Sequence, residues 1–299
     1  RVAYVKALVA DNRYVEISYT PDSAGYLHLA DNIANLKGYA QENTHSQYLS
    51  LLRTPGYPFF YAFFECLGNA PVSVLWAQAF IGAGISVLTA LLSFMIIKKI
   101  SVAIIVGMLS SISTTSLFLT GEIMVDLLFA FSFLMGFCLL YRGITRLKKT
   151  LIVTAGLAFG LSTLVKPTTL LWPVFSILIY FLLSKAHNVK IKPNAVILFI
   201  AVQALIIAGW SFRNYHTSGI FTFSTIGAQT LRHYLAVEVD VLAKQKNTPA
   251  TIITSIQDEK KRLNSSVQAA LYSGVSVKSL YDKQLRESAE ILLSNLYLT

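Results

Sequence analysis

The sequence SVLWAQAFIGAGISVLTALLSFMII, from residue 73 to residue 97, contains no charged side chain. An α-helix rises about 1.5 Å per residue, and the hydrocarbon core of a bilayer is about 30 Å thick. About 20 consecutive apolar residues therefore suffice to cross a membrane, and this stretch is longer than that. We predict a transmembrane helix here, which decides the class of the fold.

Further apolar stretches follow along the chain, at residues 102–119, 123–140, 151–165, 170–183 and 195–210. With 54% apolar and 13% charged residues, the chain is too apolar for an ordinary soluble domain. We expect an all-α fold, a polytopic transmembrane helix bundle of about six spans over residues 73–212, with extracytoplasmic amphipathic helices and loops. The short stretches on either side of Lys166 could instead form a re-entrant pair.

The formal net charge of +10 is distributed unevenly. Basic residues without any neighbouring acid occupy alternate connections between the apolar stretches, namely Lys98 and Lys99, then Arg142, Arg146, Lys148 and Lys149, then Lys185, Lys190 and Lys192. This is the positive-inside pattern of membrane proteins, so the connections that carry Glu122, Asp126 and Lys166 should face outward. Because basic and aromatic residues do not alternate on a soluble segment, we expect no nucleic-acid partner.

The predicted orientation places both polar ends of the chain on one side of the membrane. Residues 1–72 should form the first extracytoplasmic loop with interfacial helices, and residues 213–299 an extracytoplasmic helical segment. Helical periodicity predicts helices over 225–241, 252–272 and 279–298. An outward-facing first loop needs a preceding span, so we expect the chain to be a fragment that lacks its first span and its C-terminal part.

Two polar residues of the first loop are candidates for chemistry. Asp22 follows Pro21 and begins a predicted amphipathic helix that Gly38 would end. It could simply cap this helix, or it could act as a general base near the membrane surface. Arg53 precedes the run Thr54-Pro55-Gly56-Tyr57-Pro58. Its guanidinium could snorkel to lipid headgroups or bind a substrate phosphate with two hydrogen bonds.

Aromatic residues follow Arg53, and Tyr57, Phe59, Phe60 and Tyr61 favour an aromatic belt, although they could also flank a prenyl chain or a sugar. Glu122 lies at the outer end of a predicted span. It is either a substrate-binding carboxylate or a helix-capping acid. Lys166 is a candidate anion-binding cation. Arg213 and Asn214 follow Trp210, where interfacial anchoring is the alternative to substrate binding.

Several classes of site have no support in the sequence. It contains no glycine-rich phosphate loop, no histidine pair at metal-ligand spacing and no recognisable Ser/His/Asp arrangement. We therefore expect no metal and no cofactor. The two cysteines, Cys66 and Cys138, are interpreted as small buried apolar residues without a disulfide.

Several separated motifs, taken in order, resemble bacterial membrane glycosyltransferases of the GT-C class, the family of dolichyl-phosphate-mannose protein mannosyltransferases and lipid A aminoarabinose transferases. The similar motifs are Asp22-Ser23 with Tyr26, Leu29-Ala30, Asn32 and Gly38-Tyr39, then Arg53-Thr54-Pro55-Gly56-Tyr57-Pro58, Thr120-Gly121-Glu122, Leu164-Val165-Lys166-Pro167, and Arg213-Asn214-Tyr215 with Gly219. The resemblance covers residues 21–227, and residues 53–58 are its most specific part.

The resemblance implies an inverting transfer of a sugar from a polyprenyl-phosphate donor to a protein, lipid or glycan acceptor. Asp22 would be the general base, and Arg53, Lys166 and Arg213 would bind the phosphate. The implied location is the bacterial inner membrane, among membrane lipids, with the active site on the extracytoplasmic side.

The sequence also departs from this family. Ser23 follows Asp22 where the protein mannosyltransferases carry Glu, and Lys166 stands where many relatives have Arg. The departure at Ser23 does not support the acceptor class of the protein mannosyltransferases. The resemblance ends at Gly227, before the outer region expected to recognise the acceptor, so it implies neither a particular sugar nor a particular acceptor. The alternative function is a transporter or flippase for a lipid-linked or polar solute. Such a protein should show polar groups at mid-membrane, yet the predicted spans are mostly apolar.

Overall fold

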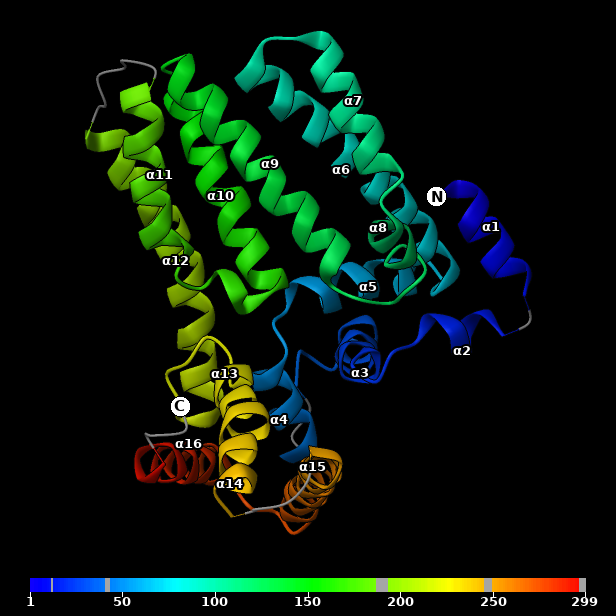
Figure 1. Ribbon diagram of the computed structural model, residues 1–299, viewed down its shortest axis with the longest axis vertical. Coiled ribbons are helices and arrows are strands. Elements are labelled where there is room, and N and C mark those ends of the chain that lie inside the picture. Colours follow the sequence, from blue (N-terminus) through cyan, green and yellow to red (C-terminus); the bar gives the residue numbers. More distant parts are fainter. Residues whose placement is uncertain (12, 41–43, 187–192, 245–248, 296–299) are drawn as a thin grey trace. The chain divides into compact units, whose positions relative to one another are not determined.

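The computed structural model describes residues 1–11, 13–40, 44–186, 193–244 and 249–295 (Figure 1). These described residues form helices and loops and contain no strand, which confirms the predicted all-α class. Their contacts divide the chain into two compact units. Unit 1 comprises Arg1–Tyr39 and Thr54–Trp210, and unit 2 comprises Ala40–Arg53 and Ser211–Thr299.

Unit 1 contains the apolar helices. Its elements are α1 (Val2–Ala10), α2 (Tyr14–Ser18), α3 (Ser23–Ala34), α5 (Gly56–Cys66), α6 (Val72–Ile97), α7 (Ile100–Ser111), α8 (Thr114–Phe118), α9 (Asp126–Thr145), α10 (Lys149–Val165), the 3-10 turn η1 (Pro167–Thr169), α11 (Trp172–Ala186) and the part of α12 (Pro193–Ser218) up to Trp210. Among the described residues, three helices are long and apolar enough to cross a membrane, namely α6, α9 and α12. The apolar helices α7, α10 and α11 are shorter.

The stretch 102–119 forms two helices rather than the single one we predicted. Helix α7 ends at Ser111, and α8 begins after Ser113, whose hydroxyl oxygen accepts a hydrogen bond from the backbone N–H of Ser116 at 3.4 Å. Serine is a favourable N-cap because its side chain satisfies a backbone donor at the start of a helix. A local capping signal therefore interrupts an otherwise continuous apolar stretch.

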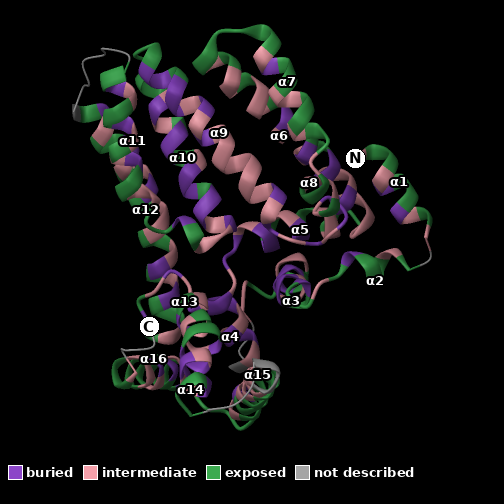
Figure 2. Ribbon diagram, in the orientation of Figure 1, coloured by how far each residue is buried: buried purple, intermediate pink, exposed green. Residues whose placement is uncertain are grey.

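Apolar side chains on the outside of unit 1 are consistent with insertion into a membrane. Helix α7 exposes Ile104, Ile105 and Met108, which are 49%, 56% and 63% exposed. Figure 2 shows exposed residues along much of both α7 and α11. A water-soluble protein rarely leaves a large contiguous apolar patch uncovered, whereas lipid chains are themselves apolar.

Two apolar clusters hold unit 1 together. The first joins α1, α3, α5 and α6 to the residues that precede α9, and it contains Tyr26, Tyr57, Leu75 and Ile123. The second joins α9, α10, α11 and α12 around Phe159, whose ring centroid lies 5.2 Å from that of Trp172. The first cluster matters most for the site, because it packs the N-terminal helices against the bundle.

The basic connections of unit 1 gather at one end of its helices. Lys98 and Lys99 lie between α6 and α7, and Arg146 and Lys148 lie between α9 and α10. Figure 1 shows both connections at the same end of unit 1 as the C-terminal end of α11, which carries Lys185. Lys190 and Lys192, which belong to the predicted pattern, lie outside the described residues.

Unit 2 is built from amphipathic helices. It contains α4 (Thr44–Leu52), the end of α12, α13 (Ile226–Thr230), the π-helix η2 (Leu231–Ala236), α14 (Val237–Lys244), α15 (Pro249–Tyr272) and α16 (Val277–Ser294). Leu51 and Leu52 of α4 share its core with Ile220, Val267 and Leu280. The contacts thus group residues 40–53 with residues 211–299. The division predicted from the sequence instead places residues 40–53 in the first loop, which comprises residues 1–72. The end of the predicted helix 279–298 lies outside the described residues.

Candidate functional site

A loop rich in polar groups precedes α9, and the N-terminal segment of unit 1 is hydrogen-bonded to it. We call residues 120–126 the acidic loop, because they include Glu122 and Asp126. The backbone N–H of Ile123 donates to the carbonyl oxygen of Ser18 at 2.8 Å. The hydroxyl of Ser23 donates to the carbonyl oxygen of Ile123 at 2.9 Å. Asp22 is therefore held next to a segment that is 100 residues away in sequence.

Asp22 occupies the N-cap position of α3, as the sequence indicated. Within the described residues of this helix, however, its carboxylate makes no capping hydrogen bond. The hydroxyl of Ser23 instead accepts a hydrogen bond from the backbone N–H of Thr20 at 2.9 Å. Asp22 is an exposed residue at the surface of unit 1. The simplest structural explanation for this acid, helix capping, does not match the geometry.

Tyr57 is fully buried, in contrast to the prediction of an aromatic belt or a direct substrate contact. Its hydroxyl donates to the side-chain oxygen of Gln78 at 2.8 Å. The Gln78 amide in turn donates to the carbonyl oxygens of Thr120 and Glu122 at 3.2 and 2.7 Å. Burial is the main cause that raises the pKa of Tyr57 well above its usual value. Tyr57 therefore helps to position the acidic loop from the core of unit 1, through its hydrogen bond to Gln78.

The neighbouring aromatic residues divide between the core and the surface. Tyr61 is also buried, which corrects its assignment to the belt, whereas Phe59 is 53% exposed. On a helix, positions 57 and 61 lie on the same face, one turn apart. This face is the one packed into the core of unit 1, together with Ala62.

Glu122 is half-buried in the acidic loop. Burial raises the pKa of its carboxyl group, and the negative charge of Asp126 raises it further. The proposed alternative role as a helix cap is not observed, because α9 begins at Asp126 and Val125 occupies its N-cap position. The acid in the first turn of α9 is Asp126, which is where a negative charge interacts favourably with the helix dipole. Asp126, and not Glu122, is therefore the acid that the start of α9 explains.

Lys166 is paired with Asp126, a contact that the sequence did not reveal. Its ammonium nitrogen lies 2.7 Å from the Oδ1 atom of Asp126, and the two side chains are 35% and 27% exposed. The same nitrogen lies 5.9 Å from the centroid of the Phe129 ring. The only hint in the sequence was that opposite charges occur on connections predicted to face the same side. Because the cation is partly exposed, an incoming anion can reach it.

The run Thr54-Pro55-Gly56 fixes the turn that carries Lys166. The hydroxyl of Thr54 donates to the carbonyl oxygen of Val165 at 3.0 Å. A Cβ atom at Gly56 would lie 2.8 Å from the backbone nitrogen of Val165, so only glycine allows this close approach. The most specific motif in the sequence therefore has a structural role next to Lys166.

The remaining candidates lie in unit 2. The Arg213 guanidinium donates to the side-chain oxygen of Asn214 at 3.0 Å. Asn214 is fully buried, and its amide donates to the carbonyl oxygens of Thr222 and Phe223 at 2.9 and 3.0 Å. Asn214 thus ties the end of α12 to the following loop and is a structural residue in this geometry.

Arg53 follows α4 in the same unit. Its backbone N–H donates to the carbonyl oxygen of Leu49 at 2.9 Å, which continues the last turn of the helix. Burial raises the pKa of the neighbouring Tyr48, while a side-chain hydrogen bond with Gln284 and the charge of Arg53 oppose this effect. Unit 2 thus carries Arg53 and Arg213, whereas unit 1 carries Asp22, Glu122 and Lys166.

Both cysteines are free thiols, but Cys66 is exposed at the end of α5, which corrects its interpretation as a buried residue. Cys138 is buried in α9. Among the described residues, no cluster of three or more His, Cys, Asp or Glu side chains could hold a metal ion.

Comparisons of the chain with protein-family models, with curated proteins and with solved structures found no match.

Proposed function

We propose that this protein is an integral-membrane glycosyltransferase that moves a sugar from a polyprenyl-phosphate donor to an extracytoplasmic acceptor, with inversion and with Asp22 as general base. The proposal includes a bacterial inner-membrane location and an acceptor that is a protein, a lipid or a glycan. It rests on the motif resemblance together with the arrangement of three charged side chains in unit 1.

The observation that carries the proposal is the attachment of the Asp22 segment to the acidic loop. Hydrogen bonds from Ser23 and to Ser18 join this segment to Ile123. The same loop ends at Asp126, the ion-pair partner of Lys166. An exposed acidic residue, a carboxyl group with a raised pKa and a partly exposed cation are thus carried by directly linked segments. A carboxylate can serve as the general base, and a cation can bind the phosphate of a phosphate-linked substrate.

In the proposed reaction, an acceptor hydroxyl attacks the anomeric carbon of the donor sugar. A new C–O bond forms on the face opposite the phosphate, and the bond from the anomeric carbon to the phosphate oxygen breaks. The hydroxyl proton passes to the carboxylate of Asp22, and the bonding electron pair leaves with polyprenyl phosphate. A single displacement of this kind inverts the configuration of the sugar.

Each of the neighbouring groups has a distinct proposed role. Lys166 would stabilise the negative charge that develops on the phosphate, because electrostatic stabilisation of a leaving group lowers the barrier. The donor phosphate would then share the ammonium group that Asp126 holds at 2.7 Å. Glu122 would bind sugar hydroxyls, and Tyr57 would act indirectly by holding the acidic loop through Gln78. Arg53, Arg213 and Asn214 remain candidates for substrate binding on the resemblance alone.

The proposal is tested with the purified full chain in proteoliposomes and a panel of isotopically labelled polyprenyl-phosphate sugars. We expect transfer to an acceptor in the extract of a cell envelope, one polyprenyl phosphate released per sugar transferred, and an inverted anomeric configuration in the product. Translocation of the labelled donor between the two leaflets is measured in parallel. Leaflet exchange without any sugar transfer would overturn the proposal and favour the transporter or flippase.

A further inference from the structure

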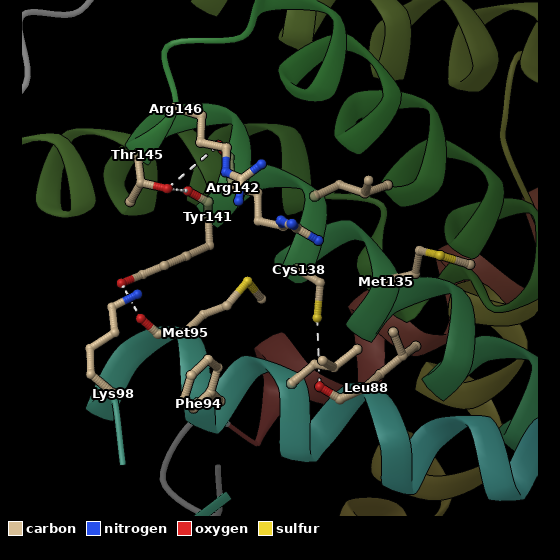
Figure 3. Close-up of a pocket in the computed structure, with 12 residues that line it drawn as sticks. Leu88, Phe94, Met95, Lys98, Met135, Cys138, Tyr141, Arg142, Thr145 and Arg146 are labelled. Atoms are coloured by element: carbon tan, nitrogen blue, oxygen red, sulfur yellow. Dashed lines mark hydrogen bonds between the residues drawn. The ribbon is translucent and has the colours of Figure 1, made fainter. Parts of the chain in front are cut away.

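A groove between α6 and α9 lies at the basic end of unit 1, far along both helices from the acidic loop. Its volume is about 420 Å³. Figure 3 shows Phe94, Met95 and Lys98 on one side of the groove, and Met135, Cys138, Arg142 and Arg146 on the other. The acidic loop ends at Asp126 in the first turn of α9, whereas Met135 lies at the middle of this helix, Cys138 and Arg142 lie beyond the middle, and Arg146 directly follows its end. The groove is therefore separate from the proposed catalytic residues.

Two side-chain contacts hold the helices together beside the groove. The hydroxyl of Tyr141 on α9 donates to the carbonyl oxygen of Met95 on α6 at 2.7 Å. The thiol of Cys138 lies 3.6 Å from the carbonyl oxygen of Leu88, at hydrogen-bond distance for sulfur. These contacts fix the separation of the two helices, so the groove is a defined feature of unit 1.

Three cations are among the residues that line the groove. Lys98 is the residue at which α6 ends, with a backbone φ of 61° that turns the chain, and its ammonium group lies 5.8 Å from the centroid of the Tyr141 ring. Arg142 and Arg146 are four residues apart and therefore lie on the same side of the end of α9. No Asp or Glu is among the described residues that line the groove, and none of the three cations forms an ion pair with a described residue.

The general features of membrane proteins explain the sign of these charges but not their arrangement. The positive-inside pattern favours basic residues both at the end of α6 and at the end of α9, and Arg142 also lies in the last turn of α9, where the helix dipole favours a cation. Lys148 and Lys149 follow the same pattern in the same connection, yet they do not line the groove. Three cations thus line a single groove together with apolar side chains, an arrangement that would suit a ligand with an anionic group and an apolar chain.

We propose that this groove binds an anionic phospholipid of the leaflet at the basic end of unit 1. The lipid phosphate would lie against Lys98, Arg142 and Arg146, and an acyl chain would lie along the apolar wall. Leu91 and Phe94 in this wall are 47% and 41% exposed, which suits an acyl chain and not a small soluble anion. Charge complementarity selects an anionic headgroup over a zwitterionic one.

The test uses the full chain in nanodiscs that contain phosphatidylcholine with a minor fraction of phosphatidylglycerol. The lipids retained by the protein after mild extraction are counted by native mass spectrometry. We expect the protein to retain phosphatidylglycerol in excess over its fraction in the nanodisc. Each juxtamembrane cation contributes a factor of about five in affinity for an anionic lipid, so Arg142→Gln and Arg146→Gln should each reduce the excess about fivefold. The double variant should abolish it.

Lys148→Gln combined with Lys149→Gln provides the matched control, because it removes the same charge from the same connection but outside the groove. An equal loss of phosphatidylglycerol in this control would mean that only the general surface charge matters, and would overturn the proposal. Displacement of the bound lipid by glycerol phosphate at millimolar concentration would also overturn it, because a soluble anion would then suffice. Thermal unfolding of each variant shows whether the fold is retained.

Discussion

Asp126 and Lys166 illustrate how one side chain alters the interpretation of another. As isolated residues, a carboxylate at the start of a helix and a lysine before a proline have ordinary explanations. Their ion pair at 2.7 Å, across 40 residues of sequence, places a cation beside the acidic loop. Because both side chains are partly exposed, the pair contributes at most about 1 kcal/mol to stability. Its importance lies in the position that it gives to the lysine.

Glu122 supplies a prediction about pH. Burial and the charge of Asp126 raise the pKa of its carboxyl group above the ordinary value of 4.5. A carboxyl group whose pKa is higher in the folded state stabilises the protein below its unfolded pKa, and this contribution is lost as pH rises through the folded value. We therefore expect Glu122→Gln to be more stable than the wild type at neutral pH, with the difference decreasing toward pH 4.

The midpoint of thermal unfolding in detergent, measured between about pH 4 and pH 7, tests this expectation. Glu16→Gln on α2 is the control, since Glu16 is an exposed acid in the same unit. A variant at position 122 whose stability relative to the wild type does not change with pH would contradict the account of this carboxyl group.

At the level of helices, the close approach of α5 to the end of α10 explains why the Thr54-Pro55-Gly56 run is so constrained. We predict that Gly56→Ala destabilises the protein by about 1–3 kcal/mol, because the new methyl group would overlap the backbone of Val165 at 2.8 Å. Gly209→Ala in α12 is the matched control, since its added Cβ would have no described atom within 4 Å apart from its chain neighbours and its own helix backbone. Denaturant or thermal unfolding of the two variants makes the comparison, and equal stability would refute the packing argument.

The helices also show which predictions a sequence permits. Hydropathy identified α6 almost to its ends. A helix that faces lipid along its whole length consists mostly of apolar residues, so its limits can be read from local composition. The break between α7 and α8 was missed because a single serine cap, Ser113, outweighed the apolar character of its neighbours. The membership of α4 in unit 2 could not be predicted, because it depends on Leu51 and Leu52 packing against residues far along the chain.

The candidate site was predictable as a set of residues but not as an arrangement. Asp22, Glu122 and Lys166 were recognisable because charged groups beside apolar spans are costly and need a reason. The burial of Tyr57 and the role of Asn214 became evident only from their hydrogen bonds. The relay through Gln78 was missed altogether, since a glutamine within an apolar stretch gives no sign of its partners.

Across the molecule, the two ends of the unit 1 helices differ in charge. The basic connections between helices lie at one end, as Figure 1 shows, and the acidic loop lies at the other end of α9. The positive-inside pattern predicts that the acidic loop faces away from the cytoplasm. The exposed thiol of Cys66 at the end of α5 provides a probe of this orientation, because the predicted first loop should share that side.

We predict that a membrane-impermeant maleimide labels the protein in spheroplasts. Cys66→Ser should abolish this labelling, whereas Cys138→Ser should leave it unchanged, because Cys138 is buried in α9. Labelling of Cys66 only after the membrane is permeabilised would reverse the predicted orientation, and would place Asp22 on the side where lipid-linked sugars are not expected to be used.

The rate of sugar transfer by Asp22→Asn tests the proposed role of this carboxylate most directly. Asparagine keeps the size of the side chain but cannot accept the proton, and loss of a general base typically lowers the rate by a factor of about 10²–10⁴. The control is Asp31→Asn, an exposed acid on the same helix that lies 4.0 Å from Lys37. We predict that kcat falls by this factor in Asp22→Asn, with the KM for the donor and the thermal stability unchanged, while Asp31→Asn behaves as the wild type. Full activity of Asp22→Asn would contradict the account.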